Sequence, residues 1–451
     1  MTVDCTSTAM CRMEGRRLVC EVSVFLKHLR DNIEVVWEEE FPVQVNTARD
    51  SLSRAIAWDL RTTVYPSQVS FSVAILSPDT SEAHIQPLSD DELITEEMLS
   101  SLRVDVSFPD GSLYGRAVNL RAFLLELSQC DITTTNGTSI LLLPDINCPM
   151  FGFEEQSFIV VRDCYPVLFD LIMKRASPVR VALAGTPGIG KTCFLIYFLW
   201  RLLHSELQSS DNFPRVLFHD KERDRFVIHE NGSVLPLIDQ PGYAFAQRAH
   251  PDIWYLVDSV EPELTVYTNI LLVAPPDRSL VKHHNKDAIP FATWYMPLWT
   301  EREIEDLIAL RGDSPVIRLN QEKFGNIPRS LFTSQEDSLA SLAKAWEEAV
   351  RSVTRQALTN AFFGSKKDTS IVHHVIHMEV PKWRNMNSNT GLPKNDFTTM
   401  YLKFASQMSQ EAIITNLCEN RPQDLQSFLE SAPSASIAGN LCKKMFEAYA
   451  F

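Results

Sequence analysis

The sequence predicts an α/β fold with a mainly parallel sheet in its central part, between a small α+β domain and a mostly helical region. Three observations lead to this prediction. Short apolar runs alternate with helices or long connections in the centre, as in parallel sheets. One of these runs leads through a glycine-rich loop into an apolar helical stretch. Beyond residue 334 the apolar positions recur mostly at helical spacing.

Composition limits the classes of protein to which the chain can belong. Its 451 residues are enough for several domains. With 57 acidic against 42 basic side chains, and a net charge of −15, we do not expect it to attract nucleic acid by charge. Its nine cysteines include no CxxC pair, which favours reduced thiols inside a cell. No apolar stretch is long enough to cross a bilayer, so composition alone favours a cytoplasmic protein without a membrane partner.

Residues 1–112 have the pattern of a small α+β domain. A helical pattern covers 50–60, and strand-like runs lie at 18–26, 33–45 and 69–76. The turn Pro109-Asp110-Gly111 favours a boundary near residue 112. We therefore predict a header domain of roughly ubiquitin size.

Residues 113–178 read as a helical linker region. Helical periodicity is seen at 115–127 and again at 158–176. Ser177-Pro178 ends the second stretch, because proline disfavours a helical conformation in the residue before it. The apolar strand 179–184 then begins the central domain, which we place at 179–335.

The remaining elements of the central domain follow in order. Its further strands are expected at 215–219, 225–229, 253–257, 269–274 and 293–296. Thr300 and Glu303 form a capping box that begins a helix, and Gly312 ends this helix after Arg311. The last predicted region, 336–451, is mostly helical and contains one strand-like segment at 371–380.

The glycine-rich loop after strand 179–184 matches the pattern GxxxxGK[ST] of a nucleotide-binding P-loop. Its residues are Gly185, Thr186, Pro187, Gly188, Ile189, Gly190, Lys191 and Thr192. The glycines let the backbone wrap a phosphate with inward-facing amides at the positive end of the next helix. The alternative, a chance match, is disfavoured by the strand before the loop and the helix after it.

The loop predicts binding of a purine nucleoside triphosphate with Mg²⁺. Lys191 would reach the β- and γ-phosphate oxygens, and the Thr192 hydroxyl would be a ligand of the metal ion. The second carboxylate on the magnesium side is expected at the end of a buried strand, where Asp258 follows 253–257. Asp258 could instead be an ordinary aspartate at the end of a strand.

The residues for hydrolysis are less clear from the sequence. Ser259 rather than a glutamate follows Asp258, and Glu261 is the candidate to orient water in its place. An arginine would stabilise charge that develops on the γ-phosphate, and Arg329 and Arg278 are candidates. Surface ion pairs are the alternative for both arginines, and they are the favoured interpretation for Arg278.

A group of histidines suggests a metal site at first sight. His373 and His377 are four residues apart, as ligands on one face of a helix would be, and His374 lies between them. The HExxH pattern is absent, and the neighbouring apolar residues favour a strand on which His373, His377 and Glu379 share a face. We favour a structural role for this group.

Several ordered stretches resemble the P-loop NTPase module of the Crinkler effectors and the related retrotransposon-hot-spot proteins. The resemblance covers roughly residues 155–451. Its most specific parts beyond the loop are Gly325-Asn326-Ile327-Pro328-Arg329 and the stretch 295–299. The other matching stretches are 158–166, 194–200, 254–258, 403–406 and 446–450.

The resemblance implies an effector delivered into a host cell and reaching its nucleus, with a ubiquitin-like header that serves secretion or trafficking. Two departures stand out. Ala274-Pro275-Pro276 follows a strand where the family usually has a small hydroxyl residue, which puts γ-phosphate sensing in doubt. Family members often continue into an effector domain, whereas this sequence stops at Phe451, so we expect no complete nuclease.

The function expected from the sequence is a slow switch driven by Mg-ATP that rearranges attached domains and acts on a host protein partner. ATP is preferred to GTP because no aspartate-bearing guanine-reading motif is present. Two alternatives stay open. One is a nucleotide-binding interaction protein without hydrolysis, and the other is a truncated member of a nuclease-bearing effector family.

Overall fold

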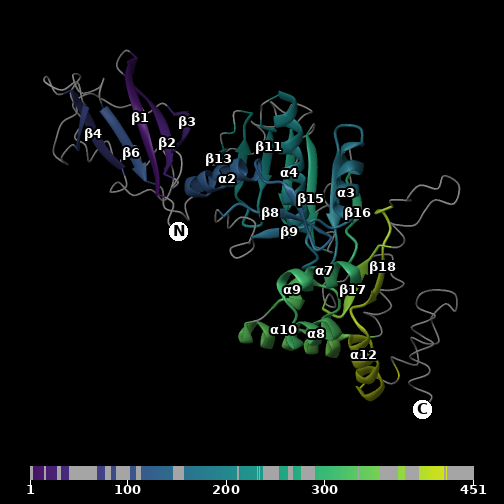
Figure 1. Ribbon diagram of the computed structural model, residues 1–451. Helices are drawn as coiled ribbons and strands as arrows, with labels where there is room; N and C mark the ends of the chain where they lie inside the picture. The colour runs from purple at the N-terminus through teal and green to yellow at the C-terminus, as the bar shows by residue number, and fades with distance from the viewer. Residues whose placement is uncertain are drawn as a thin grey trace. The chain divides into compact units, whose positions relative to one another are not determined.

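The computed structural model describes part of the chain (Figure 1). The described residues are 4–14, 17–27, 32–39, 69–76, 83–87, 102–107, 113–145, 157–210, 213–230, 232, 234–236, 253–262, 268–275, 290–333, 335–354, 374–380, 396–420 and 423. The chain divides into two compact units, of which the first is 1–130 with 143–157 and 202–248, and the second is 131–142 with 158–201 and 249–451. None of the described helices is long and apolar enough to span a membrane.

The first unit begins with a six-stranded sheet in the order β3-β2-β1-β6-β4-β5. Its strands are β1 (Asp4–Glu14), β2 (Arg17–Lys27), β3 (Asn32–Glu39), β4 (Val69–Leu76), β5 (Ala83–Pro87) and β6 (Leu102–Ser107). All five pairings are antiparallel. The runs predicted at 18–26 and 69–76 are strands, whereas β1, β5 and β6 were not predicted. The helix expected at 50–60 lies outside the described residues.

Helix α2 (Leu113–Leu127) and an antiparallel meander complete the described part of this unit. The meander consists of β11 (Val216–His219), β12 (Arg225–Ile228) and β13 (Val234–Pro236). Arg116 of α2 forms ion pairs with Asp220, Glu222 and Asp224 in the β11–β12 turn. Because Asp220 is fully buried, this arginine supplies the charge that makes its burial tolerable.

The second unit contains four parallel strands, which confirm the mainly parallel sheet predicted for the centre of the chain. They are β10 (Arg180–Ala184), β14 (Trp254–Asp258), β15 (Asn269–Ala274) and β16 (Ala292–Tyr295). Strand β10 pairs with β15 and β16, and β15 also pairs with β14. Within this unit the strand order is β14-β15-β10-β16. Strands buried on both faces explain the continuous apolar runs in the sequence.

Aromatic side chains pack helix α4 (Lys191–Ser210) in the core of this unit. The Phe198 ring lies 4.8 Å from the Trp254 ring of β14 and 5.0 Å from the Phe169 ring of α3 (Cys164–Met173). Phe194 and Phe198 are fully buried, so the first turns of α4 are held firmly where the glycine-rich loop enters them.

The helix expected over 158–176 begins later than predicted. Residues 158–160 form strand β9 (Phe158–Val160), and α3 starts only at Cys164. Strand β9 pairs with the hairpin of β7 (Ile132–Thr135) and β8 (Thr138–Leu142), whose turn places Asn136 and Gly137 at φ 52° and 81°. The buried Ile159 and Val160 are β-branched residues, which suit a strand better than a helix end.

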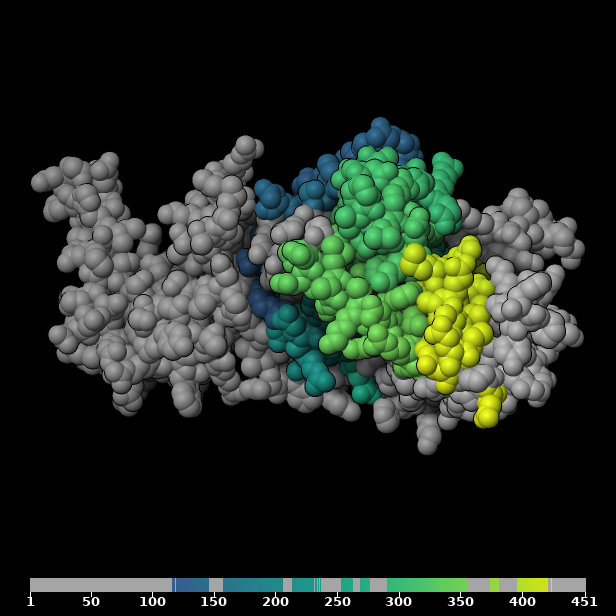
Figure 2. Space-filling model, turned by 90° about the horizontal axis from the view of Figure 1, so that it is seen from below, coloured from purple at the N-terminus to yellow at the C-terminus, as the bar shows by residue number. Residues whose placement is uncertain are grey.

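The capping box and its helix are confirmed by α7 (Glu301–Arg311), whose N-cap Thr300 accepts from the Glu303 amide and whose C-cap is Gly312. Among the described residues, four further helices follow: α8 (Pro315–Phe324), α9 (Pro328–Leu331), α10 (Glu336–Ser352) and α12 (Gln407–Asn420). Figure 2 shows α12, in yellow, beside the green surface of the preceding helices. The strand-like segment 371–380 contains β17 (Ile376–Glu379), which pairs with β18 (Tyr401–Phe404), a strand that was not predicted.

Candidate functional site

The glycine-rich loop, Gly185–Thr192, runs from the end of β10 to the first turn of α4. Gly188 and Gly190 have φ values of 82° and 99°, which a residue with a side chain adopts only under strain. A Cβ atom on Gly190 would lie 2.7 Å from the Tyr165 hydroxyl, and one on Gly188 would lie 2.9 Å from the Cβ of Arg329. Glycine is thus required at both positions by conformation and by close packing.

The Lys191 ammonium lies across the start of the loop. Its Nζ donates to the carbonyl oxygens of Gly185 at 2.8 Å and Thr186 at 3.0 Å. Burial, together with the nearby charge of Arg329, lowers the pKa of Lys191 to about 7, although Asp258 acts in the opposite direction. An anion with several negative charges at this position would favour the charged form of the buried Lys191 and raise its pKa.

Thr192 and Asp258 face each other beside the lysine. The Thr192 hydroxyl donates to Oδ2 of Asp258 at 3.0 Å, and the Ser259 hydroxyl donates to Oδ1 at 2.8 Å. Asp258 is only 3% exposed at the end of β14. Neighbouring oxygen ligands of an octahedral Mg²⁺ lie about 3.0 Å apart, because each metal–oxygen bond is about 2.1 Å. The Thr192–Asp258 pair therefore fits two adjacent positions around such an ion.

The position after Asp258 differs from what water activation would need. Ser259 has φ 60°, its amide donates to the Val273 carbonyl at 2.8 Å, and its hydroxyl is directed to Asp258. Glu261, predicted as the stand-in base, is exposed and lies beyond the end of β14. Arg278 lies outside the described residues.

Arg329 is brought to the loop by the short helix α9. Its Cβ and the Ile327 side chain are the closest atoms to Gly188, and its charge acts on Lys191. The side chain is exposed. The sequence-predicted residues Lys191, Thr192, Asp258 and Arg329 thus come together at one loop from three different elements, α4, β14 and α9.

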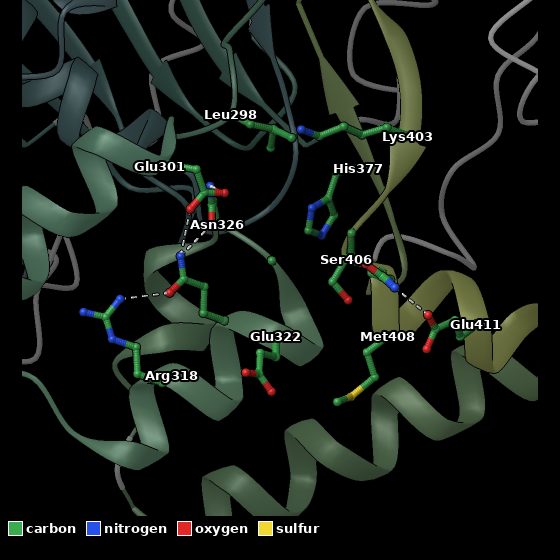
Figure 3. A pocket seen from close by; sticks show the side chains of 14 residues that line it. Leu298, Glu301, Arg318, Glu322, Asn326, His377, Lys403, Ser406, Met408 and Glu411 are labelled. Carbon is green, nitrogen blue, oxygen red and sulfur yellow. Dashed lines mark hydrogen bonds between the residues drawn. The ribbon is translucent and has the colours of Figure 1, made fainter. Parts of the chain in front are cut away.

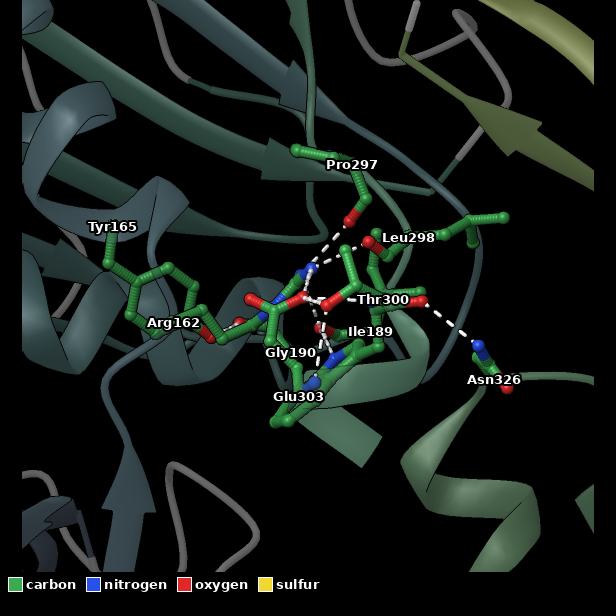
Figure 4. Close-up of polar contacts among 10 residues, drawn as sticks. Arg162, Tyr165, Ile189, Gly190, Pro297, Leu298, Thr300, Glu303 and Asn326 are labelled. Atoms are coloured by element: carbon green, nitrogen blue, oxygen red, sulfur yellow. Dashed lines mark hydrogen bonds and ion pairs between the residues drawn. The ribbon is translucent and has the colours of Figure 1, made fainter. Parts of the chain in front are cut away.

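A fully buried arginine, Arg162, supports the loop (Figure 4). Arg162 donates to the carbonyls of Leu298 at 2.8 Å and Pro297 at 3.0 Å, and it forms an ion pair with Glu303 at 3.3 Å. The Ile189 carbonyl accepts from the Trp299 indole at 2.8 Å and is 3.5 Å from Arg162. Burial alone would raise the pKa of Glu303, but the charge of Arg162 and the Thr300 hydrogen bonds lower it.

The Arg162 network was missed by sequence reasoning, although its members lie in stretches that carried the family resemblance. The Tyr165 hydroxyl, which donates to the Gly190 carbonyl at 2.7 Å, belongs to the same support. A charged residue directly after the apolar run 158–161 was the available signal, because a charge in such a place requires a partner.

The hairpin of β17 and β18 also contacts the loop. The Met378 amide donates to the Thr186 hydroxyl at 2.9 Å. A cavity of about 520 Å³ lies beside this contact, between Thr186, Arg329, His377 and the α10 residues Asp337 and Ser341. The buried His377 thus lies at the wall of the candidate site, and it shares a strand face with Glu379 as predicted. His373 lies outside the described residues.

A second cavity, of about 540 Å³, is also lined by His377 (Figure 3). Glu301, Glu322, Lys403 and Glu411 are among its charged lining residues. Within the described residues, the group of carboxylates that could hold a metal ion is Asp220, Glu222 and Asp224, and Arg116 occupies it. The metal interpretation of the histidines gains no support from the described residues.

The fold and the site define a mixed α/β protein in which a strand, a glycine-rich loop and a helix present a lysine and a threonine beside a buried aspartate. No family model matches the chain. The chain is 24% identical over 298 residues to Crinkler effector proteins 16 and 15 of Phytophthora infestans. Each alignment covers 64% of this chain and 45% of the relative, so the chain is a distant homologue of part of these Crinkler effector proteins.

Proposed function

We propose that this chain is a Crinkler-like effector whose central domain is a P-loop NTPase that binds Mg-ATP and acts as a slow switch. The observation that carries the proposal is the convergence of Lys191, Thr192, Asp258 and Arg329 at one glycine-rich loop. A triphosphate would be held by the loop and Lys191, while Mg²⁺ would bind Thr192 and Asp258 and neutralise charge on the phosphates.

The switch mechanism follows from which elements contact the loop. Arg329 belongs to α9, and Met378, which binds Thr186, belongs to the β17–β18 hairpin. Loss of the γ-phosphate would change the charge that faces Arg329 and Lys191, and thereby the position of α9, which carries Arg329. Hydrolysis would be slow because Ser259 occupies the place of a water-orienting glutamate, with the exposed Glu261 as its substitute.

The biological role is proposed from the two relatives, which are named as effectors. In this proposal the chain is secreted into a host cell, reaches the host nucleus and acts on a host protein. The first domain would serve as its ubiquitin-like trafficking header.

Calorimetric titration of the full chain with Mg-ATP tests the nucleotide site. Lys191→Ala removes a charged contact worth about 1.5–3 kcal/mol, so we expect affinity to fall by about 10- to 150-fold. Lys344→Ala is the matched control, because this lysine lies on the exposed side of α10. Absence of heat with both Mg-ATP and Mg-GTP would refute the proposal.

A non-hydrolysing nucleotide-binding interaction protein is the second candidate function. The hydrogen bond from Ser259 to Asp258 favours it, because this serine fills the place of a general base without being one. Steady-state phosphate release that disappears in Asp258→Asn would exclude this candidate, whereas tight binding without any release would establish it.

A further inference from the structure

The cavity of about 520 Å³ beside the glycine-rich loop has walls from several elements of the second unit. Thr186 and Pro187 of the loop form part of the wall, α9 contributes Arg329, and α10 contributes Asp337 and Ser341. Ligand pockets usually occupy about 300–1,000 Å³, so this cavity has the size of a binding site. A ligand held by the loop would therefore face it.

The contacts of Lys191 indicate which end of a triphosphate would face the cavity. Its Nζ donates to the Gly185 and Thr186 carbonyls, and the lysine of a P-loop reaches the β- and γ-phosphates. The first residues of the loop, which include the two that line the cavity, therefore lie at the γ-phosphate end. Arg329 is next to the loop as well, because its Cβ and Cδ atoms would lie 2.9 and 3.7 Å from a Cβ atom on Gly188.

One face of α10 lines the same cavity. Its residues 337, 338, 341, 342 and 345 lie on one side of the helix, because they recur at the spacing of helical turns. Asp337 is the carboxylate among the described lining residues, and neither it nor Arg329 forms an ion pair within the described part of the chain. Glu336, in the same first turn of α10, does not line the cavity, and neither does Glu261. An unpaired carboxylate and an unpaired guanidinium thus share the cavity at the γ-phosphate end.

We propose that Asp337 is a catalytic residue, which orients the water molecule that attacks the γ-phosphate and accepts its proton. The inference rests on the proposed function of the loop, and it gives Asp337 the role for which the sequence suggested Glu261. A carboxylate that accepts a proton from the attacking oxygen is a recurring part of phosphoryl-transfer sites. Ser341, one turn further along α10, offers a hydroxyl that can bind the same water.

The reaction needs no partner besides water. The water oxygen bonds to the γ-phosphorus while the bond from this phosphorus to the oxygen shared with the β-phosphate breaks, and ADP leaves with that oxygen. The proton of the water goes to the Asp337 carboxylate, and the Arg329 guanidinium faces the charge that develops on the γ-phosphoryl group. Because Asp337 and Ser341 are exposed, bulk water reaches the cavity and weakens these interactions, which fits a slow reaction.

Single-turnover phosphate release and calorimetric titration of the full chain with Mg-ATP together test this role. We expect Asp337→Asn to slow phosphate release by about 100-fold or more, the usual range for loss of a general base, and to change Mg-ATP affinity by less than about threefold. Asp337→Glu keeps a carboxylate and should retain at least about a tenth of the unaltered rate. Glu336→Gln removes an acidic residue from the same helical turn, and Glu261→Gln removes the candidate from the sequence. Both should stay within about threefold of the unaltered rate, because neither residue lines the cavity.

The outcomes distinguish failure of the inference from failure of the proposed function. If the unaltered chain binds no Mg-ATP, the proposed function itself is refuted. If it releases phosphate, but Asp337→Asn keeps more than about a third of the rate or loses no more than Glu336→Gln, Asp337 is not the catalytic residue. Binding without any release by the unaltered chain would also overturn the inference, while the nucleotide site would stand. Circular dichroism spectra and unchanged Mg-ATP affinity confirm that a slow variant is folded.

Discussion

Substitution of Gly190 by alanine tests whether the Tyr165 hydroxyl closes the loop from one side. The added Cβ would lie 2.7 Å from that hydroxyl, at a φ of 99°. The backbone conformation costs about 1–2 kcal/mol for a residue with a side chain. Overpacking against the tyrosine adds about 1–3 kcal/mol. We therefore expect Gly190→Ala to lower the free energy of unfolding by about 2–5 kcal/mol in total.

Gly312 provides a control that separates the two contributions. It has a similar φ of 94°, but nothing lies within 4 Å of an added Cβ. Gly312→Ala should therefore show only the backbone cost, which is about 1–3 kcal/mol for a sparsely populated conformation. Gly190→Ala should exceed it by the overpacking contribution.

Tyr165→Phe removes the obstructing oxygen together with its hydrogen bond to the Gly190 carbonyl. On its own this change should cost about 0.5–1.5 kcal/mol, because the Gly190 carbonyl loses one of its two donors and keeps the hydrogen bond from the Phe194 amide. Combined with Gly190→Ala, it should relieve the contact and give a favourable coupling energy of about 1–3 kcal/mol. Thermal and denaturant unfolding of the four variants measures these terms. Additivity within about 0.5 kcal/mol would refute the assignment of Tyr165 as the obstacle.

Three further predictions follow from charges and close contacts. At pH 8, Mg-ATP binding should be accompanied by uptake of nearly one proton, because Lys191 has a pKa of about 7 in the free protein and the triphosphate favours its charged form. Calorimetry in buffers of different ionisation enthalpy measures this uptake. An equal uptake at pH 6 would contradict the prediction. Gly325→Ala should destabilise the second unit by more than about 4 kcal/mol, because the added Cβ atom would lie 2.0 Å from the Ala405 carbonyl oxygen. A change in unfolding free energy as small as that of Gly312→Ala would contradict this packing. Arg116→Ala should cost about 3–5 kcal/mol by leaving the Asp220 carboxylate buried without its cation. Burial already raises the pKa of Asp220, against the effect of Arg116. Without Arg116, protonation of Asp220 removes the unpaired buried charge, so the difference in melting temperature between the variant and the unaltered chain should become smaller from pH 8 to pH 5. A difference that stays constant over this range would refute this reasoning.

The parts of the site that could be predicted are those fixed by neighbouring residues. The loop pattern, the strand before it and the Thr300–Glu303 capping box are local signals, and the structure has each of them. The Asn136-Gly137 turn between β7 and β8 is equally local and could have been found from its sequence. Strand β9 was not predicted because only three residues separate it from α3, so the two elements together were interpreted as one helix.

The supports of the loop could not be predicted, because they depend on contacts between distant residues. Arg162 reaches Leu298, 136 positions along the chain, and no periodicity in either stretch specifies that pairing. The same is true of Arg311, whose two aromatic neighbours come from different elements. Only the folded chain shows that Arg162 supports the loop and that Arg311 lies between two rings.

The hydrogen bond between Thr186 and Met378 joins residues that are 192 positions apart. At ribosomal rates of roughly 5–20 residues per second, about 10–40 s separate the synthesis of one from that of the other. During this interval the nascent loop has no bonding partner at Thr186 from the β17–β18 hairpin. A polypeptide interrupted before residue 374 would keep every residue of the GxxxxGK[ST] pattern and still lack this hydrogen bond. We therefore expect the loop to be fully ordered only in chains whose translation has passed the β17–β18 hairpin.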